Sequence, residues 1–368
     1  MKKTLLTICL VWMCFSLSAQ KIIDLSGKWS FSIDRQDNGE KEKWFSHTLN
    51  DFINLPGSMP EKLKGDEVTA KTQWTGSLYD SSYYYNPYME KYRKEGNIKF
   101  PFFLTPDKHY VGAAWYQKEV NIPADWKGER ILLFLERPHI ETTVWVNGQK
   151  TGMQNSLCVP HQYDITRYVR PGKCTITIRV DNRIKEINVG PDSHSITDQT
   201  QGNWNGIVGR ICLQTTPKTY FDDIQIYPEP EQKLARVKVV IKGTGTAKVK
   251  LSAESFNTDK KHIVPAIQQE IKLNKGVTET EMVLPMGNDM LLWDEFHPAL
   301  YKLKAEVTNG KKTEIKEIQF GIRRFEIKGK WFYVNGRKTQ LRGTVENCDF
   351  PLTGYAPMDV ESWERVFR

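Results

Sequence analysis

The chain has 368 residues, of which 39% are hydrophobic and 26% charged, and it carries a formal net charge of +8 at pH 7. This length and composition are those of a soluble globular protein with two or three domains. Lys and Arg slightly outnumber Asp and Glu, and acidic residues lie among the basic ones all along the chain. The sequence has no arginine-rich helix and no nucleic-acid motif. Charge and motifs together argue against a partner that is nucleic acid or a membrane surface.

The first 19 residues have the pattern of a secretory signal peptide. Lys2 and Lys3 precede a short apolar run at residues 5–15, and residues 17–19 end in a small residue, Ala19. The apolar run is too short for a permanent membrane anchor. We expect export to the periplasm or the extracellular space with cleavage after Ala19. Loss of the two lysines would lower the net charge from +8 to +6.

Four cysteines remain after this cleavage, and none belongs to a Cys-x-x-Cys pair, so a zinc site is not expected. An exported protein can form disulfides. We expect mostly buried free thiols, with one disulfide possible. The four are Cys158, Cys174, Cys212 and Cys348.

Residues 20–217 predict a first β sandwich. Trp29, Phe31 and Ile33 alternate with polar residues, and Asn147-Gly148 and Pro171-Gly172 supply turns. Alternation with such turns is typical of antiparallel sheets, and about 200 residues in one unit suit a jelly roll. Further alternating runs cover residues 115–122, 130–136, 142–146, 175–180 and 210–214.

An irregular stretch at residues 69–110 interrupts this sandwich and holds eleven aromatic residues, among them Trp74 and Tyr88. Loops of this length without regular structure are usually functional. We expect an aromatic insertion at the edge of the sandwich, facing a further domain or a substrate. The alternative is a loop that packs on its own rings.

Residues 218–325 predict a second sandwich. Val237, Val239 and Ile241 alternate with polar residues, as do Val249 and Leu251. About 100 residues with strands every 8–12 positions fit an immunoglobulin-like domain.

Residues 326–368 predict a strand at 338–342, a loop, and a helix that begins after Asp359, a suitable N-cap. This order is that of the first β/α unit of a (β/α)₈ barrel. Such a barrel needs about 250 residues, and only 26 follow Arg342. The predicted fold is therefore mostly β: two sandwiches, then the start of an incomplete, truncated barrel.

Seven segments in a fixed order, together with the run at residues 320–343, resemble glycoside hydrolase family 2, the family of β-galactosidases, β-glucuronidases and β-mannosidases. The resemblance spans residues 24–368. The segments are residues 25–29 with 53–58, 114–120, 141–148, 163–166, 180–182, 203–210 and 293–301.

The chain departs from the family after Gly343. The family usually has an Asn and a His there, whereas Asn347 or Cys348 falls near the position of the His. Because this loop borders the sugar pocket in the family, the departure leaves the sugar specificity open.

The resemblance implies a retaining glycosidase, which needs two carboxyl groups about 5–5.5 Å apart and no metal or organic cofactor. The family's acid/base Glu follows an Asn on a later barrel strand, and this chain has no Asn-Glu dipeptide. We therefore expect no catalytic residue here and no activity from this chain alone. Asp294, Glu295 and His297, like Glu136 and Glu141, are interpreted as structural.

The resemblance also implies residues that contact substrate. Asp198, Asn203 and Trp204 correspond to a sandwich loop that reaches over the barrel, although Trp204 could equally be a buried core ring. Arg342, Asn347 and Asp349 follow the first barrel strand, where barrel active sites form.

These observations predict the N-terminal part of an exported retaining exo-β-glycosidase that acts on oligosaccharides, with a β-galactoside as the default substrate. A homo-oligomer is possible. The alternatives are a non-catalytic carbohydrate-binding or scaffold protein and a surface adhesion protein. The amphipathic helix at residues 359–367 favours the enzyme, because a pair of sandwiches would leave its apolar side without a partner.

Overall fold

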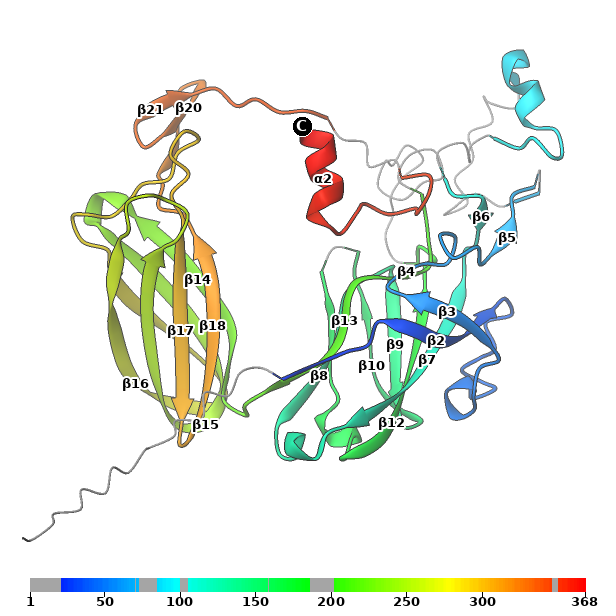
Figure 1. Ribbon diagram of the computed structural model, residues 1–368, viewed down its shortest axis with the longest axis horizontal. Coiled ribbons are helices and arrows are strands. Elements are labelled where there is room, and N and C mark those ends of the chain that lie inside the picture. The colour runs from blue at the N-terminus through cyan, green and yellow to red at the C-terminus, as the bar shows by residue number, and fades with distance from the viewer. Residues whose placement is uncertain are drawn as a thin grey trace, which may run out of the picture. The chain divides into compact units, whose positions relative to one another are not determined.

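The computed structural model describes residues 21–69, 71–72, 85–99, 105–157, 159–185, 202–345 and 350–368. These residues are mostly β, as predicted (Figure 1). They divide into two compact units. The first unit contains Ile22–Thr215 with Gly343–Arg368, and the second contains Thr216–Arg342.

The first unit is built from two antiparallel sheets. A six-stranded sheet has the order β10-β9-β12-β7-β2-β3, and a five-stranded sheet has the order β1-β13-β8-β11 with β4 also paired to β13. The larger sheet comprises β2 (Gly27–Asp34), β3 (Asp51–Leu55), β7 (Ala113–Ile122), β9 (Glu141–Val146), β10 (Gln149–Asn155) and β12 (Gly172–Asp181). The smaller comprises β1 (Ile22–Asp24), β4 (Gly57–Ser58), β8 (Arg130–Pro138), β11 (His161–Asp164) and β13 (Gly206–Thr216).

Short elements complete this unit. A two-stranded ladder, β5 (Asp66–Glu67) with β6 (Lys108–His109), stands where the stretch 69–110 leaves and rejoins the sandwich. The 3-10 helices are η1 (Trp44–Ser46), η3 (Pro87–Tyr92), η5 (Ala124–Trp126) and η6 (Thr166–Tyr168).

The two sheets enclose one core, as side chains from Phe31, Leu133, Ile178 and Ile211 show. Because side chains alternate along a strand, Ile178 points into this core while Arg179 lies on the opposite face of β12. That outer face is covered as well, by a smaller cluster of Leu49, Trp115 and Trp145 packed with Trp44 and Phe45. The centre of the six-stranded sheet is thus buried on both faces.

The second unit contains a five-stranded antiparallel sheet around its own core. The order is β14-β15-β17-β18, with β16 also paired to β15. Its strands are β14 (Tyr220–Glu229), β15 (Leu234–Ser255), β16 (Ile263–Pro285), β17 (Tyr301–Asn309) and β18 (Lys312–Phe320), and η7 (Pro230–Gln232) lies between the first two.

The structure corrects one detail of the predicted second sandwich. The two short strands expected near Val239 and Val249 are parts of one strand, β15, which is 22 residues long. Gly243-Thr244-Gly245 lies within β15, and the pairing of β15 with β16 continues past it with a register shift. A bulge lets the strand bend while it remains paired, so the first half of β15 pairs with β14 and the second half with β17.

Residues 325–339 form a small antiparallel sheet of β19 (Phe325–Lys328), β20 (Trp331–Val334) and β21 (Arg337–Thr339). Residues 340–345 form no strand. The predicted last strand therefore ends at Thr339 and belongs to this local sheet, so the described residues show no β/α barrel unit. The predicted helix is present as α2 (Val360–Phe367), and the Asp359 side chain caps it by accepting a hydrogen bond from the Ser362 amide at 2.8 Å.

Among the described residues, Cys174 and Cys212 are buried and free. Burial raises the pKa of the Cys174 thiol to about 11. Cys158 and Cys348 lie outside the described residues. No helix in the described part of the chain is both long and apolar enough to cross a membrane.

The first prediction concerns the main core. Ile178→Ala removes a fully buried side chain from the central strand β12, so it should lower the free energy of unfolding by about 2–5 kcal/mol. Urea unfolding followed by tryptophan fluorescence measures this. Lys173→Ala, at an exposed position of the same strand, should change it by less than about 0.5 kcal/mol. Equal effects of the two variants would refute the assignment of Ile178 to the core.

Candidate functional site

The structure describes three of the six predicted substrate-contacting residues. Asp198, Asn347 and Asp349 lie outside the described residues. Asn203 and Trp204 are neighbours in the first unit, just before β13, whereas Arg342 belongs to the second unit. The site can therefore be built around Asn203 and Trp204.

Trp204 is only 5% exposed. Its ring stacks on His139 with centroids 4.6 Å apart, and the ring of Tyr355 lies 5.4 Å away at a tilt of 50°. The side chain thus occupies the position expected for the alternative interpretation, a buried ring. Contact between Trp204 and a sugar stays a prediction.

Asn203 uses both ends of its amide inside the protein. Its Oδ1 lies 3.0 Å from His139 Nε2, and its Nδ2 donates to the carbonyl of Asn182 at 2.9 Å. Burial lowers the pKa of His139 to about 4, against the opposing effect of the bond to Asn203, so the imidazole is neutral at pH 7.

Asn205, two residues on, is bonded in the same way. Its Nδ2 donates to the carbonyls of Gly112 and Val180 at 3.0 Å each, and its Oδ1 accepts from Tyr116 Oη at 2.7 Å. The Asn-Trp-Asn run therefore ties the start of β13 to the ends of β7 and β12. Sequence reasoning treated the run as a family signature and did not find this bonding.

A segment near the C-terminus packs on the same place. Ser58 Oγ donates to the Thr353 carbonyl at 2.5 Å, and Tyr355 Oη donates to Glu61 Oε2 at 2.8 Å. Gly354 has a positive φ of 82°, and an added Cβ would lie 3.4 Å from Trp204 Cβ. A glycine suits both the left-handed backbone and this close approach. We call residues 353–355 the docking segment.

Residues on either side of the docking segment contact α2. Trp363 Nε1 donates to the Pro357 carbonyl at 3.0 Å, and the Trp363 ring lies edge-on to Phe350 with centroids 6.3 Å apart. The described residues that follow position 350 are thereby anchored on the first sandwich. No short-range pattern could reveal this, because Ser58 and Thr353 are 295 positions apart.

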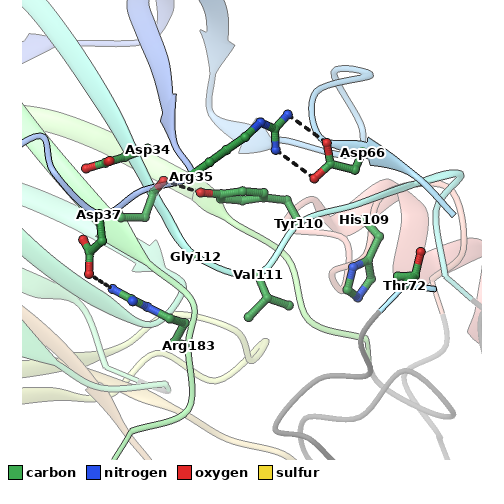
Figure 2. A pocket seen from close by; sticks show the side chains of 11 residues that line it. Asp34, Arg35, Asp37, Asp66, Thr72, His109, Tyr110, Val111, Gly112 and Arg183 are labelled. Carbon is green, nitrogen blue, oxygen red and sulfur yellow. Dashed lines mark hydrogen bonds and ion pairs between the residues drawn. The ribbon is translucent and has the colours of Figure 1, made fainter. Parts of the chain in front are cut away.

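A cavity of 390 Å³ opens on the first unit, at the end of β2 and the start of β7 (Figure 2). Its walls also include residues of the β5–β6 ladder. Arg183, which lies just after the end of β12, forms another part of the wall. None of the described lining residues stands in a sequence motif that indicates a site. The lining residues are Asp34, Arg35, Asp37, Asp66, Thr72, His109, Tyr110, Val111, Gly112, Ala113 and Arg183.

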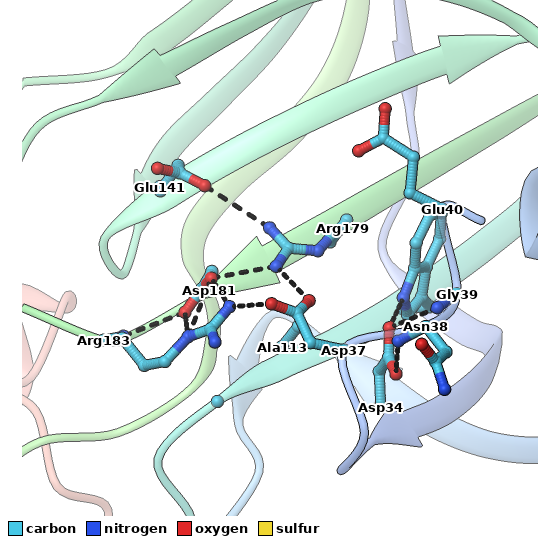
Figure 3. A network of polar contacts seen from close by, with 12 residues as sticks. Asp34, Asp37, Asn38, Gly39, Glu40, Ala113, Glu141, Arg179, Asp181 and Arg183 are labelled. Carbon is cyan, nitrogen blue, oxygen red and sulfur yellow. Dashed lines mark hydrogen bonds and ion pairs between the residues drawn. The ribbon is translucent and has the colours of Figure 1, made fainter. Parts of the chain in front are cut away.

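A polar network stands behind one wall of this cavity (Figure 3). Arg179 donates to Asp37 at 2.6 Å, to Asp181 at 2.9 Å and to Glu141 at 3.3 Å. Arg183 also bonds Asp37 and Asp181. Burial alone would raise the pKa of Asp181, but hydrogen bonds from Arg183 and Lys185 outweigh it and hold that pKa well below its usual range.

Asp34 anchors the neighbouring turn. One of its carboxylate oxygens accepts from Trp115 Nε1 at 2.8 Å and from the Gly39 amide at 2.9 Å, and the other accepts from the Asn38 amide at 2.9 Å. The carboxylate thus joins the turn after β2 to β7 and forms a second fixed part of the cavity wall.

The acidic groups weighed as catalysts in the sequence have structural partners. Asp294 Oδ1 accepts from the amides of Phe296 and His297 at 2.8 Å each. Glu136 accepts from the Arg210 amide at 2.6 Å. Glu141 pairs with Arg179 and Lys185. Within the described ranges, no group of three or more His, Cys, Asp or Glu side chains could hold a metal ion.

Comparison with known families gives two matches in order along the chain. The model of the glycosyl hydrolases family 2 sugar binding domain matches residues 22–217. A second model, described as glycosyl hydrolases family 2, matches residues 219–323. The first of these alone covers more than half of the chain.

Curated relatives are named as glycosidases. A β-glucuronidase from Paenibacillus borealis is 24% identical over 355 residues, which is 91% of this chain and 51% of the relative. A β-galactosidase from Thermoanaerobacter pseudethanolicus is 25% identical over 281 residues, which is 72% of this chain and 35% of the relative. The human β-glucuronidase is 24% identical over 369 residues, or 90% and 49%. The chain spans about half the length, or less, of these relatives.

Solved structures share the fold. A β-glucuronidase from Ruminococcus gnavus in complex with D-glucaro-δ-lactam has a TM-score of 0.62 at 19% identity, covering 89% of this chain and 49% of that one. A β-glucuronidase from an uncultured Clostridium has a TM-score of 0.59 at 20% identity, covering 87% and 48%. At this identity the likeness concerns the fold alone.

The second prediction concerns the docking segment. Burial and the neighbouring Glu61 raise the pKa of Tyr355, so its hydroxyl remains a donor at neutral pH. Tyr355→Phe removes that bond, which should cost about 0.5–1.5 kcal/mol of docking free energy and speed trypsin cleavage within residues 350–368. Mass spectrometry of timed digests measures the rate. The exposed Tyr88→Phe variant is the control, and an unchanged rate in Tyr355→Phe would contradict the docking.

The third prediction concerns acid stability. Burial tends to raise the pKa of Asp37, but hydrogen bonds from Arg179 and Arg183 lower it overall, and Asp181 is lowered in the same direction. A carboxyl group whose pKa is lower in the folded than in the unfolded protein stabilises the fold at pH values above the unfolded pKa of about 4. This stabilisation is lost as the pH falls below that value toward the folded pKa. The Tm of the wild type should therefore begin to drop near pH 5 and keep falling as the pH is lowered toward about 1.

Asp37→Asn tests this assignment. The variant should have a lower Tm than the wild type at pH 7, and the difference should shrink as the pH falls below about 4. Glu119→Gln, which alters an exposed ion pair with Lys173, should follow the wild-type curve. A constant difference between Asp37→Asn and the wild type at every pH would show that Asp37 acts through something other than its charge.

Proposed function

Because this chain belongs to glycoside hydrolase family 2, we propose that it is the N-terminal part of an exported retaining exo-β-glycosidase. The reaction is the removal of a terminal β-linked sugar from an oligosaccharide outside the cytoplasm. The proposal rests on one observation above all: two successive family models match residues 22–217 and 219–323.

The catalytic step requires groups that we place outside this chain. Retention of configuration needs an acid/base and a nucleophile about 5–5.5 Å apart. The carboxylates of Asp294, Glu136 and Glu141 are held by backbone amides or by basic side chains, and the sequence has no Asn-Glu dipeptide. We propose that residues 326–368 open a barrel that supplies the two carboxyl groups and that this chain alone is inactive.

The role of the chain in this reaction is to bind and to position. Tyr355 of the docking segment packs on Trp204 and bonds Glu61, and Asn347 and Asp349 precede this segment in the sequence. Together with Asp198 and Asn203, these residues are proposed to contact the hydroxyl groups of the sugar. A carboxylate suits this task because its oxygens accept hydrogen bonds from hydroxyl groups, and an amide suits it because it both donates and accepts.

The substrate proposed first is a β-galactoside. The relatives include both β-galactosidases and β-glucuronidases, so a β-glucuronide is the second substrate to test. The signal-like residues 1–19 support export.

The fourth prediction tests this function. Purified chain should release no p-nitrophenol from p-nitrophenyl β-D-galactoside or β-D-glucuronide above the buffer rate, because the proposed acid/base and nucleophile are absent. Absorbance at alkaline pH measures release. Hydrolysis by the chain alone would show that the catalytic pair lies within it and would refute its assignment as a binding and positioning part.

Reading the encoding DNA beyond the codon for Arg368 tests the remainder of the proposal. An open frame with an Asn-Glu dipeptide and a second Glu on later strands supports the glycosidase, and the longer protein should then hydrolyse one of the two glycosides. A stop codon at that point would overturn the glycosidase and leave the non-catalytic carbohydrate-binding protein.

A further inference from the structure

The family resemblance implies no function for the cavity of the first unit. Asn203 and Trp204 are not among the described residues that line it. All of the described residues that line it belong to one compact unit.

Two guanidinium–carboxylate pairs form its polar walls. Arg35 binds both oxygens of Asp66 at 2.8 Å each, and Arg183 binds Asp37 at 2.6 Å. Figure 2 shows these pairs on two sides of Tyr110, with the Val111 side chain below the Tyr110 ring. Arginine and aspartate thus alternate around an opening that also offers a small apolar surface.

The wall is fixed before any ligand arrives. Arg183 and Asp37 are held from behind by Asp181 and Arg179. Asp34 is held by an indole and two backbone amides. Polar groups that are already ordered lose little entropy on binding, which is the condition for specific recognition by a small site.

These groups keep hydrogen-bonding capacity after pairing with one another. A carboxylate has about four lone-pair positions and a guanidinium has five N–H donors. Arg35 uses Nη1 and Nη2 on Asp66, and Arg183 uses Nε and Nη2 on its two aspartates. The remaining N–H groups and lone pairs can meet a ligand that both donates and accepts.

The charge of the lining selects the ligand further. Three aspartates face two arginines in the wall, so an anionic ligand would meet a net negative surface and arginines that are already paired. A neutral polyol meets no such penalty, because each hydroxyl is both a donor and an acceptor. The volume of 390 Å³ falls in the range of about 300–1,000 Å³ typical of small-molecule sites.

We propose that this cavity binds a neutral saccharide, with Arg35, Asp66, Asp37 and Arg183 contacting its hydroxyl groups and Val111 contacting an apolar face of the ring. The choice of a saccharide over other neutral polyols rests on the proposed function. The position, polarity and size of the site are observed in the structure and do not depend on the proposed function.

The fifth prediction is tested with lactose as the probe, added at millimolar concentration to the purified chain. Saturation-transfer difference NMR should detect binding, and a titration gives its Kd. Arg35→Ala and Asp66→Ala remove the exposed pair at the rim and should each weaken binding about tenfold, equivalent to about 1.4 kcal/mol. Val111→Trp should fill the cavity and abolish binding.

Matched controls separate the site from general effects. Glu119→Ala removes an exposed, paired carboxylate elsewhere on the same unit, with the same change of charge as Asp66→Ala, and should leave the Kd unchanged. Thermal melting of every variant confirms that the fold is retained, and the rim variants keep the test valid if Val111→Trp does not fold.

Three outcomes would overturn the proposal. They are an absence of lactose transfer signals, lactose binding that none of the cavity variants weakens, and binding of glucuronic acid in preference to lactose. The assay requires no hydrolysis, so its result is distinguishable from that of the glycoside assay. A chain that binds lactose here without glycosidase activity in any longer form would support the cavity and refute the proposed enzyme.

Discussion

Arg179 and Asp181 lie on the face of β12 that points away from the main core, and both are buried. Burying charges is costly unless each is paired and hydrogen-bonded. The chain meets this condition by bringing Asp37 from the turn after β2 and Glu141 from the start of β9 onto Arg179. This requirement holds Asp37 against Arg179, and the bonds of Asp34 to Trp115, Asn38 and Gly39 hold the rest of the turn that forms one wall of the cavity.

The aromatic cover on the same face works alongside the ion network. Trp115 on β7 and Trp145 on β9 lie on the two strands that flank β12, with ring centroids 4.9 Å apart. The ring of Phe45 stacks on Trp145 with centroids 5.2 Å apart. Because Trp115 also donates to Asp34, the apolar cover and the polar wall share one residue. This sharing makes the cavity part of the rigid body of the sandwich.

The Asn-Trp-Asn-Gly run gains a physical explanation from its surroundings. Asn203 and Asn205 bond the ends of neighbouring strands, and Trp204 receives the docking segment. Gly206 has a φ of 149°, and a Cβ there would lie 2.4 Å from the Gly57 carbonyl oxygen. Only glycine allows β13 to approach β4 so closely. In the family this run suggests contact with sugar. In the structure of this chain, its observed role is to hold the ends of neighbouring strands together.

The sequence by itself determined the mostly β architecture, the alternation that places Ile176, Ile178 and Val180 on one face, the cap at Asp359, and the family. These depend on local periodicity, local hydrogen bonds and motif order. Only the tertiary structure decided that β15 is one bent strand, that Arg179 meets Asp37 across 142 positions, and that Tyr355 reaches Glu61 across 294. Local patterns show which face a residue occupies, whereas its partner depends on how distant segments are brought together by the fold.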